Sequence, residues 1–149
     1  MPTVEFEVET SVPPETVRAA LVDFGERRFE LWPGLERSLY EVYSVGETTA
    51  DVKEGSKLPV AELWVRNRYD WSDPETVRWT TTESNFCAPG SYVTATVRPR
   101  EGGGSTIRVH WQRRMRGLWG RVVGLVIAVT RGKPEAASFE EMVRRLERS

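Results

Sequence analysis

The sequence has only one cysteine and one histidine among its 149 residues. A single cysteine, Cys87, excludes an intramolecular disulfide and a zinc site built from several cysteines. We interpret Cys87 as a packing residue, because no basic neighbour in the sequence would lower its pKa. His110 falls on the solvent side of its predicted strand, where it could not serve a serine–histidine–aspartate assembly. We therefore expect neither a metal nor a cofactor.

A strong charge of either sign is also lacking, since the net charge is −1. The overall charge thus provides no general attraction for nucleic acid or an anionic membrane. Basic residues cluster between Arg108 and Arg121, and we interpret that cluster as a solvated patch.

No apolar run is long enough to span a membrane. The longest, from Leu118 to Thr130, is shorter than the roughly 20 residues that a span needs, and Arg121 interrupts it. We predict that it is a helix buried within its own domain. No signal peptide is apparent at the N-terminus, so a cytoplasmic location is expected.

What is present is a long series of strand-like segments between helical ones. The length predicts a single domain, residues 1–149. Apolar residues alternate with glutamates from Val4 onward and predict a strand over 4–12. A helix is predicted to begin at Pro14, because proline is tolerated in the first turn, and a second short helix follows over 27–32.

The period of two returns at Tyr40 and predicts further strands separated by turn sequences. These predicted strands cover residues 40–47, 49–53, 60–71, 76–86, 91–100 and 106–115. The remainder, from Leu118 to Arg148, is predicted to be helical, and Gly132-Lys133-Pro134 should kink or break it. This order predicts an antiparallel sheet closed by a terminal helix, with a cavity between them.

The segment Val12-Pro13-Pro14-Glu15-Thr16-Val17, followed by Asp23-Phe24 and Trp32-Pro33, resembles the START-like (SRPBCC) superfamily. The chain looks closest to its bacterial polyketide cyclase/dehydrase and lipid-transport group, and the resemblance covers essentially the whole chain. It implies the α+β helix-grip fold shared with birch-pollen-type allergens. In that fold a seven-stranded curved antiparallel sheet wraps around a long C-terminal helix, kinked here, with two short helices after the first strand.

The resemblance does not fix a reaction, because the superfamily includes binders, carriers, cyclases, hydroxylase components and activators of chaperone ATPases. No catalytic residue is carried over from it. It does imply an apolar cavity between the sheet and the C-terminal helix.

Residues on the inward face of the predicted strands and helix are the candidates for ligand binding. They are Phe6, Val65, Asn67, Tyr69, Trp71, Trp79, Glu83, Val109, Trp111, Arg113, Trp119 and Val123. The alternative is that the aromatic residues among them simply fill the core. The period of two alone leaves both interpretations open.

Two charged residues on that predicted face allow two interpretations. Glu83 and Arg113 could pair across the sheet and anchor a ligand, or Glu83 could act as a general base with a raised pKa. They could also lie at strand ends in contact with water, and this second interpretation is favoured because such charges are common and weakly coupled.

Three functions are consistent with these patterns. The first is binding of a small hydrophobic ligand, either lipid-like or aromatic and polyketide-like. The second is a cyclase or dehydratase type of enzyme, in which the pocket positions a reactive chain. The third is an interaction module for another protein. The sequence names neither the ligand nor an oligomeric state, and the first function is our leading hypothesis.

Overall fold

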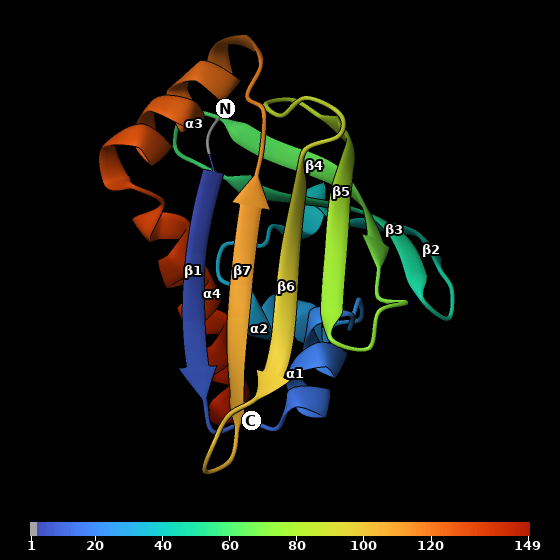
Figure 1. The fold of residues 1–149 in the computed structure, drawn as a ribbon. Coiled ribbons are helices and arrows are strands. Elements are labelled where there is room, and N and C mark those ends of the chain that lie inside the picture. Colours follow the sequence, from blue (N-terminus) through green and yellow to red (C-terminus); the bar gives the residue numbers. More distant parts are fainter. Residues whose placement is uncertain (1–2) are drawn as a thin grey trace.

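The computed structural model describes residues 3–149. Seven strands and four α-helices are connected in the predicted order (Figure 1). The strands are β1 (Thr3–Thr10), β2 (Glu41–Val45), β3 (Thr49–Lys57), β4 (Glu62–Asp70), β5 (Thr76–Ser84), β6 (Tyr92–Pro99) and β7 (Ser105–Gln112). The helices are α1 (Pro14–Leu21), α2 (Arg27–Leu31), α3 (Gly117–Thr130) and α4 (Lys133–Glu147), and a short 3₁₀ helix, η1 (Arg37–Leu39), precedes β2.

The strands form one curved sheet in the order β1-β7-β6-β5-β4-β3-β2, and every neighbouring pair is antiparallel. This confirms the predicted fold class. Successive side chains along a strand point to opposite faces of the sheet, as β1 shows. Val4 and Val8 are buried, while Glu5 is exposed and lies opposite His110. One face of the sheet is therefore apolar and can pack against helices.

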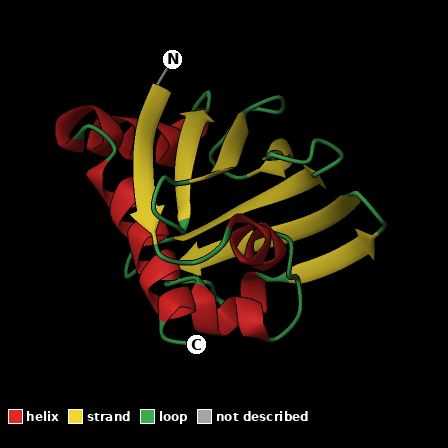
Figure 2. Ribbon diagram, turned by 60° about the horizontal axis from the view of Figure 1, so that its bottom comes forward, coloured by secondary structure: helices red, strands yellow, loops and turns green. Residues whose placement is uncertain are grey.

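Helices α1, α2 and α4 lie on the concave side of the sheet (Figure 2). Helix α4 contacts β1, α1 and α2, and its apolar stripe is buried there. The stripe consists of Phe139, Met142, Val143 and Leu146. Because these residues recur at helical spacing, the burial of one face is enough to hold α4 in place.

The C-terminal helical region is broken into two helices at Gly132, which is one of the two outcomes predicted from Gly132-Lys133-Pro134. Arg131 and Gly132 both adopt the left-handed conformation, with φ of 56° and 77°. Gly132 also lies against β1, where a Cβ atom would come within 2.5 Å of Val4 Cγ1. The chain therefore turns sharply at this point, and only glycine fits position 132 without strain.

The prediction that the segment 118–130 is buried was wrong. In α3 only Gly120 and Ile127 are buried. The helix is apolar on all sides, but α4 occupies the concave face of the sheet next to β1, so α3 packs along one side only. Among residues 3–149 no helix is long and apolar enough to cross a membrane.

Candidate functional site

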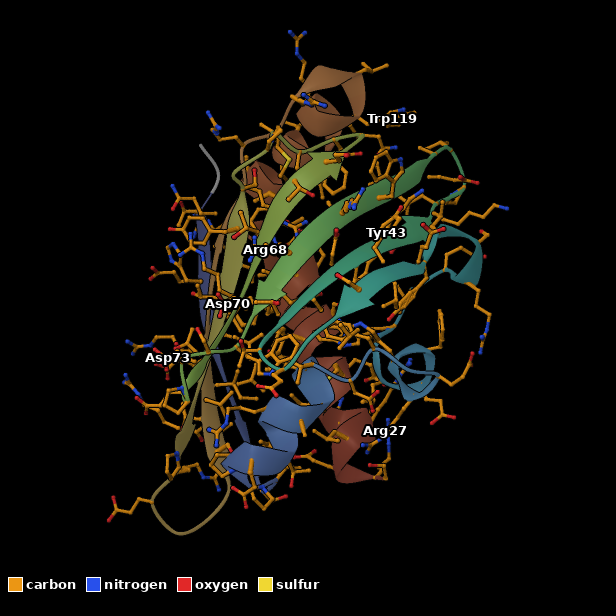
Figure 3. All side chains as sticks on the ribbon, turned by 90° about the vertical axis from the view of Figure 1, so that its right-hand side faces the viewer. Arg27, Tyr43, Arg68, Asp70, Asp73 and Trp119 are labelled. Atoms are coloured by element: carbon orange, nitrogen blue, oxygen red, sulfur yellow. The ribbon has the colours of Figure 1, made fainter. Side chains whose placement is uncertain are left out.

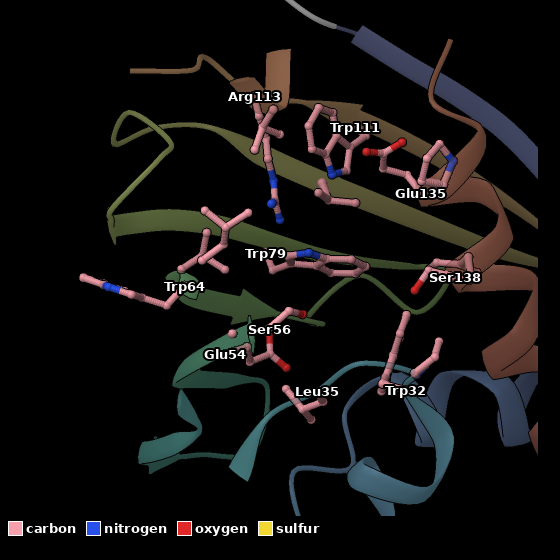
Figure 4. A pocket seen from close by; sticks show the side chains of 18 of the residues that line it. Trp32, Leu35, Glu54, Ser56, Trp64, Trp79, Trp111, Arg113, Glu135 and Ser138 are labelled. Carbon is pink, nitrogen blue, oxygen red and sulfur yellow. The ribbon is translucent and has the colours of Figure 1, made fainter. Parts of the chain in front are cut away.

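A cavity of about 600 Å³ lies between the concave face of the sheet and the helices (Figure 4). This volume is within the usual range for small-molecule sites. Its walls are mainly apolar and aromatic, and they come from β1, strands β3 to β7, all four α-helices and the segment after α2. A ligand with a large apolar surface would find complementary walls there.

Eight of the twelve predicted residues lie in the wall of this cavity. They are Phe6, Val65, Tyr69, Trp79, Val109, Trp111, Arg113 and Val123. Trp79 and Trp111 lie across the cavity from the segment that carries Trp32 (Figure 4). Because Phe6, Val109 and Trp111 come from paired strands β1 and β7 in the expected phase, the period of two alone was sufficient to find them.

The structure does not place Glu83 in the cavity. Arg66 of β4 pairs with Glu83, but the next residue, Asn67, pairs with Thr81, so Thr82 is an extra residue in β5. This bulge reverses the faces beyond it. The Glu83 side chain is 64% exposed and lies 3.7 Å from Arg66, with no contact to Arg113. Glu83 is therefore exposed to water, as the favoured interpretation expected, and neither the alternative pair with Arg113 nor a buried general base at Glu83 is present.

The other three predicted residues lie outside the cavity wall. Asn67 is buried and accepts a hydrogen bond from the Thr81 hydroxyl at 3.1 Å, which satisfies both side chains within the sheet. Trp71 is half-buried at the end of β4, with its ring 6.1 Å from that of Phe24. Trp119 packs on the core cluster around Phe86, at the end of the molecule opposite α1 (Figure 3).

A buried polar network forms part of the cavity wall, and the sequence did not reveal it. Arg28 of α2 is only 3% exposed, and its Nε donates to Glu54 Oε1 at 2.6 Å. Its other nitrogens donate to the Tyr69 hydroxyl at 2.8 Å and to the carbonyl oxygens of Leu21 and Asp23. The Tyr69 hydroxyl in turn donates to Glu54 Oε2 at 2.5 Å. Each charged group is thus compensated, as burial requires.

This network determines the protonation of its members. Burial lowers the pKa of Arg28, but the charge of Glu54 and its hydrogen bond outweigh that effect, so the net shift is upward. Burial and the negative charge of Glu54 raise the pKa of Tyr69 well above its ordinary value. At neutral pH the cavity therefore presents a neutral Tyr69 phenol beside a fixed ion pair.

Three polar atoms around the cavity have no hydrogen-bond partner. Among residues 3–149, the buried side-chain atoms in this state are Trp32 Nε1, Arg113 Nε and Glu135 Oε2, and all three residues line the cavity. Figure 4 shows Arg113 and Glu135 extending into the cavity on either side of Trp111. The Arg113 guanidinium carbon lies 4.9 Å from the centroid of the Trp111 ring.

Partnerless buried polar groups are rare in folded proteins because each costs about 1–3 kcal/mol. All three belong to residues of one cavity, so its otherwise apolar wall also contains a guanidinium, an indole and a carboxyl group. Sequence reasoning missed Trp32 and Glu135. Trp32 follows a short helix and Glu135 lies in the first turn of α4, so neither is in phase with a strand.

The two residues with nucleophilic or metal-binding potential lie elsewhere. His110 is on the outer face of the sheet, where its Nδ1 lies 2.7 Å from Glu5 Oε1. Cys87 is fully buried beside Val65 and Phe86, and burial raises the pKa of its thiol. Within residues 3–149, no three His, Cys, Asp or Glu side chains are grouped closely enough to hold a metal ion.

Comparison with known proteins agrees with this architecture. The family model described as polyketide cyclase / dehydrase and lipid transport matches residues 1–148. A search among curated protein sequences returned no match.

Several solved structures share the fold. The protein TTHA0849 from Thermus thermophilus has a TM-score of 0.75 at 18% identity, with coverage of 99% of this chain and 95% of that one. The Zhui aromatase/cyclase from a Streptomyces species has a TM-score of 0.79 at 12% identity, with coverage of 98% and 93%. A START superfamily protein from Mycobacterium smegmatis has a TM-score of 0.71 at 10% identity, with coverage of 97% and 98%. At these identities the likeness concerns the fold.

Proposed function

This chain belongs to the polyketide cyclase / dehydrase and lipid transport family, and from that premise we propose that it binds a small, largely apolar ligand in the cavity between the sheet and the helices. The ligand class is an elongated or ring-containing molecule with a hydrogen-bond acceptor at one end and a hydroxyl group at the other. The single observation that carries the proposal is an apolar, aromatic cavity of about 600 Å³ whose wall also contains Arg113 and Glu135.

Each polar group has a distinct task in this proposal. Arg113 donates to a carbonyl, phenolate or carboxylate oxygen of the ligand, and its charge makes that hydrogen bond stronger than a neutral one. Glu135 accepts a hydrogen bond from a ligand hydroxyl. The aromatic rings of Trp79 and Trp111 pack on the apolar body of the ligand.

Quenching of tryptophan fluorescence on titration tests the proposal. The probes are oleate, which carries one carboxylate, and alizarin, a hydroxylated anthraquinone with carbonyl oxygens. Saturable binding of either supports it. Arg113→Met should weaken the better probe roughly ten- to hundredfold, because a hydrogen bond to a charged group is lost. Arg114→Met is the matched control, since Arg114 is exposed and lies outside the cavity wall.

A second variant pair tests whether the cavity itself is the site. Ser138 lines the cavity, whereas the adjacent Ala137 on the same helix is exposed. Ser138→Phe should fill the cavity and abolish quenching, and Ala137→Phe should leave it unchanged. The proposal fails if no probe binds saturably, or if both phenylalanine variants bind as the parent protein does.

A cyclase type of enzyme is the second candidate, favoured by the opposite charges of Arg113 and Glu135 in one cavity. Glu135 would accept a proton from a carbon next to a ligand carbonyl, and Arg113 would stabilise the enolate oxygen. The enolate carbon would attack a second carbonyl, and Glu135 would return its proton to the new alkoxide. Glu135→Gln would abolish ring closure of a poly-β-keto thioester and keep its binding, whereas unchanged turnover would exclude this role.

A further inference from the structure

Helix α3 carries an exposed apolar stripe on its outer side. Leu118, Val122, Leu125 and Val129 are 72%, 44%, 66% and 75% exposed. Their spacing is i, i+4, i+7 and i+11, so they lie one above the other on a single helical face. We call these four residues the α3 stripe. A continuous stripe of this kind is more than the scattered apolar exposure of an ordinary surface.

The α3 stripe is not the result of a loosely attached helix. The opposite side of α3 is seated closely, since a Cβ atom at Gly120 would lie 2.6 Å from the Phe86 carbonyl oxygen. Ile127 is buried in the main core, and Trp119 and Val123 pack on the cluster around Phe86. The helix therefore holds its stripe facing outward.

The surroundings of the α3 stripe are basic. No aspartate or glutamate occurs between Glu101 and Glu135. The exposed basic residues of the adjoining segments are Arg114, Arg116, Arg121, Arg131 and Lys133. On the outer face of the neighbouring strand β1, Glu7 and Glu9 form ion pairs with Arg108 and Arg100, and Glu5 is hydrogen-bonded to His110. A near-neutral chain thus presents one end that is both apolar and cationic.

We propose that α3 docks flat on an anionic lipid surface, with the α3 stripe in the headgroup and acyl boundary. An apolar helical face flanked by arginine and lysine is the signature of interfacial helices. The basic residues supply electrostatic attraction to anionic headgroups. With 14 residues at about 1.5 Å each, α3 is too short to span a bilayer and suits this orientation.

The positive charge around the α3 stripe argues against a second copy of the chain as the partner that covers it. A two-fold dimer would bring the same patch of each subunit together, so Arg121 and its basic neighbours would face one another. Like charges across such an interface oppose association. A phospholipid surface offers the opposite charge and an apolar interior at the same time.

The proposed orientation also concerns the cavity. Val123 and Val126 of α3 line the cavity, so the helix that contacts lipid also forms part of the cavity wall. An apolar ligand could then exchange with the bilayer without crossing open water. The docking proposal does not rest on the proposed function, because the α3 stripe and its charges exist whatever the cavity holds.

Co-sedimentation with large unilamellar vesicles tests the proposal. Vesicles of phosphatidylcholine mixed with phosphatidylglycerol are compared with phosphatidylcholine alone. The protein should partition onto the anionic vesicles, and added sodium chloride should weaken binding by screening. The double variant Leu125→Asp, Val129→Asp should bind at least about tenfold more weakly, because it loses apolar burial and adds repulsive charge. Val45→Asp is the matched control, since Val45 is 56% exposed and lies on β2, at the edge of the sheet away from α3 (Figure 1).

If circular dichroism shows that the double variant is misfolded, a single charge substitution tests the proposal instead. Arg121→Glu leaves the α3 stripe intact and should weaken binding to anionic vesicles by at least about fivefold at low salt. The proposal is overturned if the parent protein stays in solution with phosphatidylglycerol vesicles, or if the α3 variants bind as tightly as Val45→Asp. It is equally overturned if the protein sediments as a dimer that Leu125→Asp dissociates. None of these failures affects the oleate and alizarin titrations, which contain no vesicles.

Discussion

Arg28 of α2 and Glu54 of β3 form a buried ion pair in the cavity wall, with Nε and Oε1 2.6 Å apart. The two residues come from elements on opposite sides of the concave space, so the pair ties the helical layer to the sheet. Tyr69 bonds both partners and completes the network. The charged groups of this part of the cavity wall all have hydrogen-bond partners, whereas Trp32 Nε1, Arg113 Nε and Glu135 Oε2 have none.

Removing Arg28 should be strongly destabilising. Arg28→Met leaves the Glu54 carboxylate uncompensated, and loss of one partner of a buried pair costs about 3–5 kcal/mol. The free energy of unfolding in urea measures the loss. Arg37→Met is the matched control, because the Arg37–Glu26 pair is exposed to solvent and its loss should change the unfolding free energy little. Equal losses in the two variants would contradict the role assigned to the network.

Stability should fall at high pH because of Tyr69. The pKa of this phenol is raised well above its ordinary value of 10.0 in the folded protein, so the folded state keeps a proton that the unfolded state releases. The contribution is fully present below pH 10 and declines above it, by about 1.4 kcal/mol per pH unit. Urea unfolding at rising pH should therefore show a shallower alkaline decline for Tyr69→Phe. Identical slopes for the parent and this variant would refute the assignment.

Cys87 should be inert in the folded protein. Burial raises the pKa of its thiol and removes it from solvent, and the thiolate is the reactive form. Its modification by iodoacetamide should proceed only as fast as the protein unfolds. A Val60→Cys variant provides an exposed thiol for comparison. Modification of Cys87 at the rate of that thiol would show that it is accessible.

Gly132 should be sensitive to the smallest side chain. Alanine there must adopt a left-handed conformation and would also overlap Val4. Gly102→Ala isolates the first cost, since Gly102 has φ of 88° but no atom within 4 Å of the added Cβ. We expect Gly102→Ala to lower the unfolding free energy by about 1 kcal/mol. Gly132→Ala should lower it by a further 1–3 kcal/mol, roughly the cost of overpacking. Equal effects would mean that α4 does not press on β1 here.

The sheet was predictable because a period of two is a local property of the sequence. Phe6 and Trp111 could be assigned to the inner face without knowledge of their partners, and the structure places both in the cavity wall. Glu83 could not, since the bulge at Thr82 depends on the register between β4 and β5 and leaves no local signal.

The remaining differences come from competition between elements. The apolar composition of α3 indicated burial, but the concave face of the sheet is occupied by α4, so Leu125 and Val129 stay exposed. Glu54 falls just beyond the predicted end of its strand, and only the fold brings it to Arg28. The positions of such residues depend on tertiary contacts, and a single sequence does not reveal those contacts.

The central claim is that the cavity holds a small, largely apolar molecule. Native mass spectrometry of the protein purified from its own host, followed by extraction under denaturing conditions, tests it most directly. We predict a retained small molecule that is released on denaturation and is absent from the Ser138→Phe variant but present in Ala137→Phe. A parent protein at its bare polypeptide mass that also fails to bind oleate and alizarin would contradict the claim.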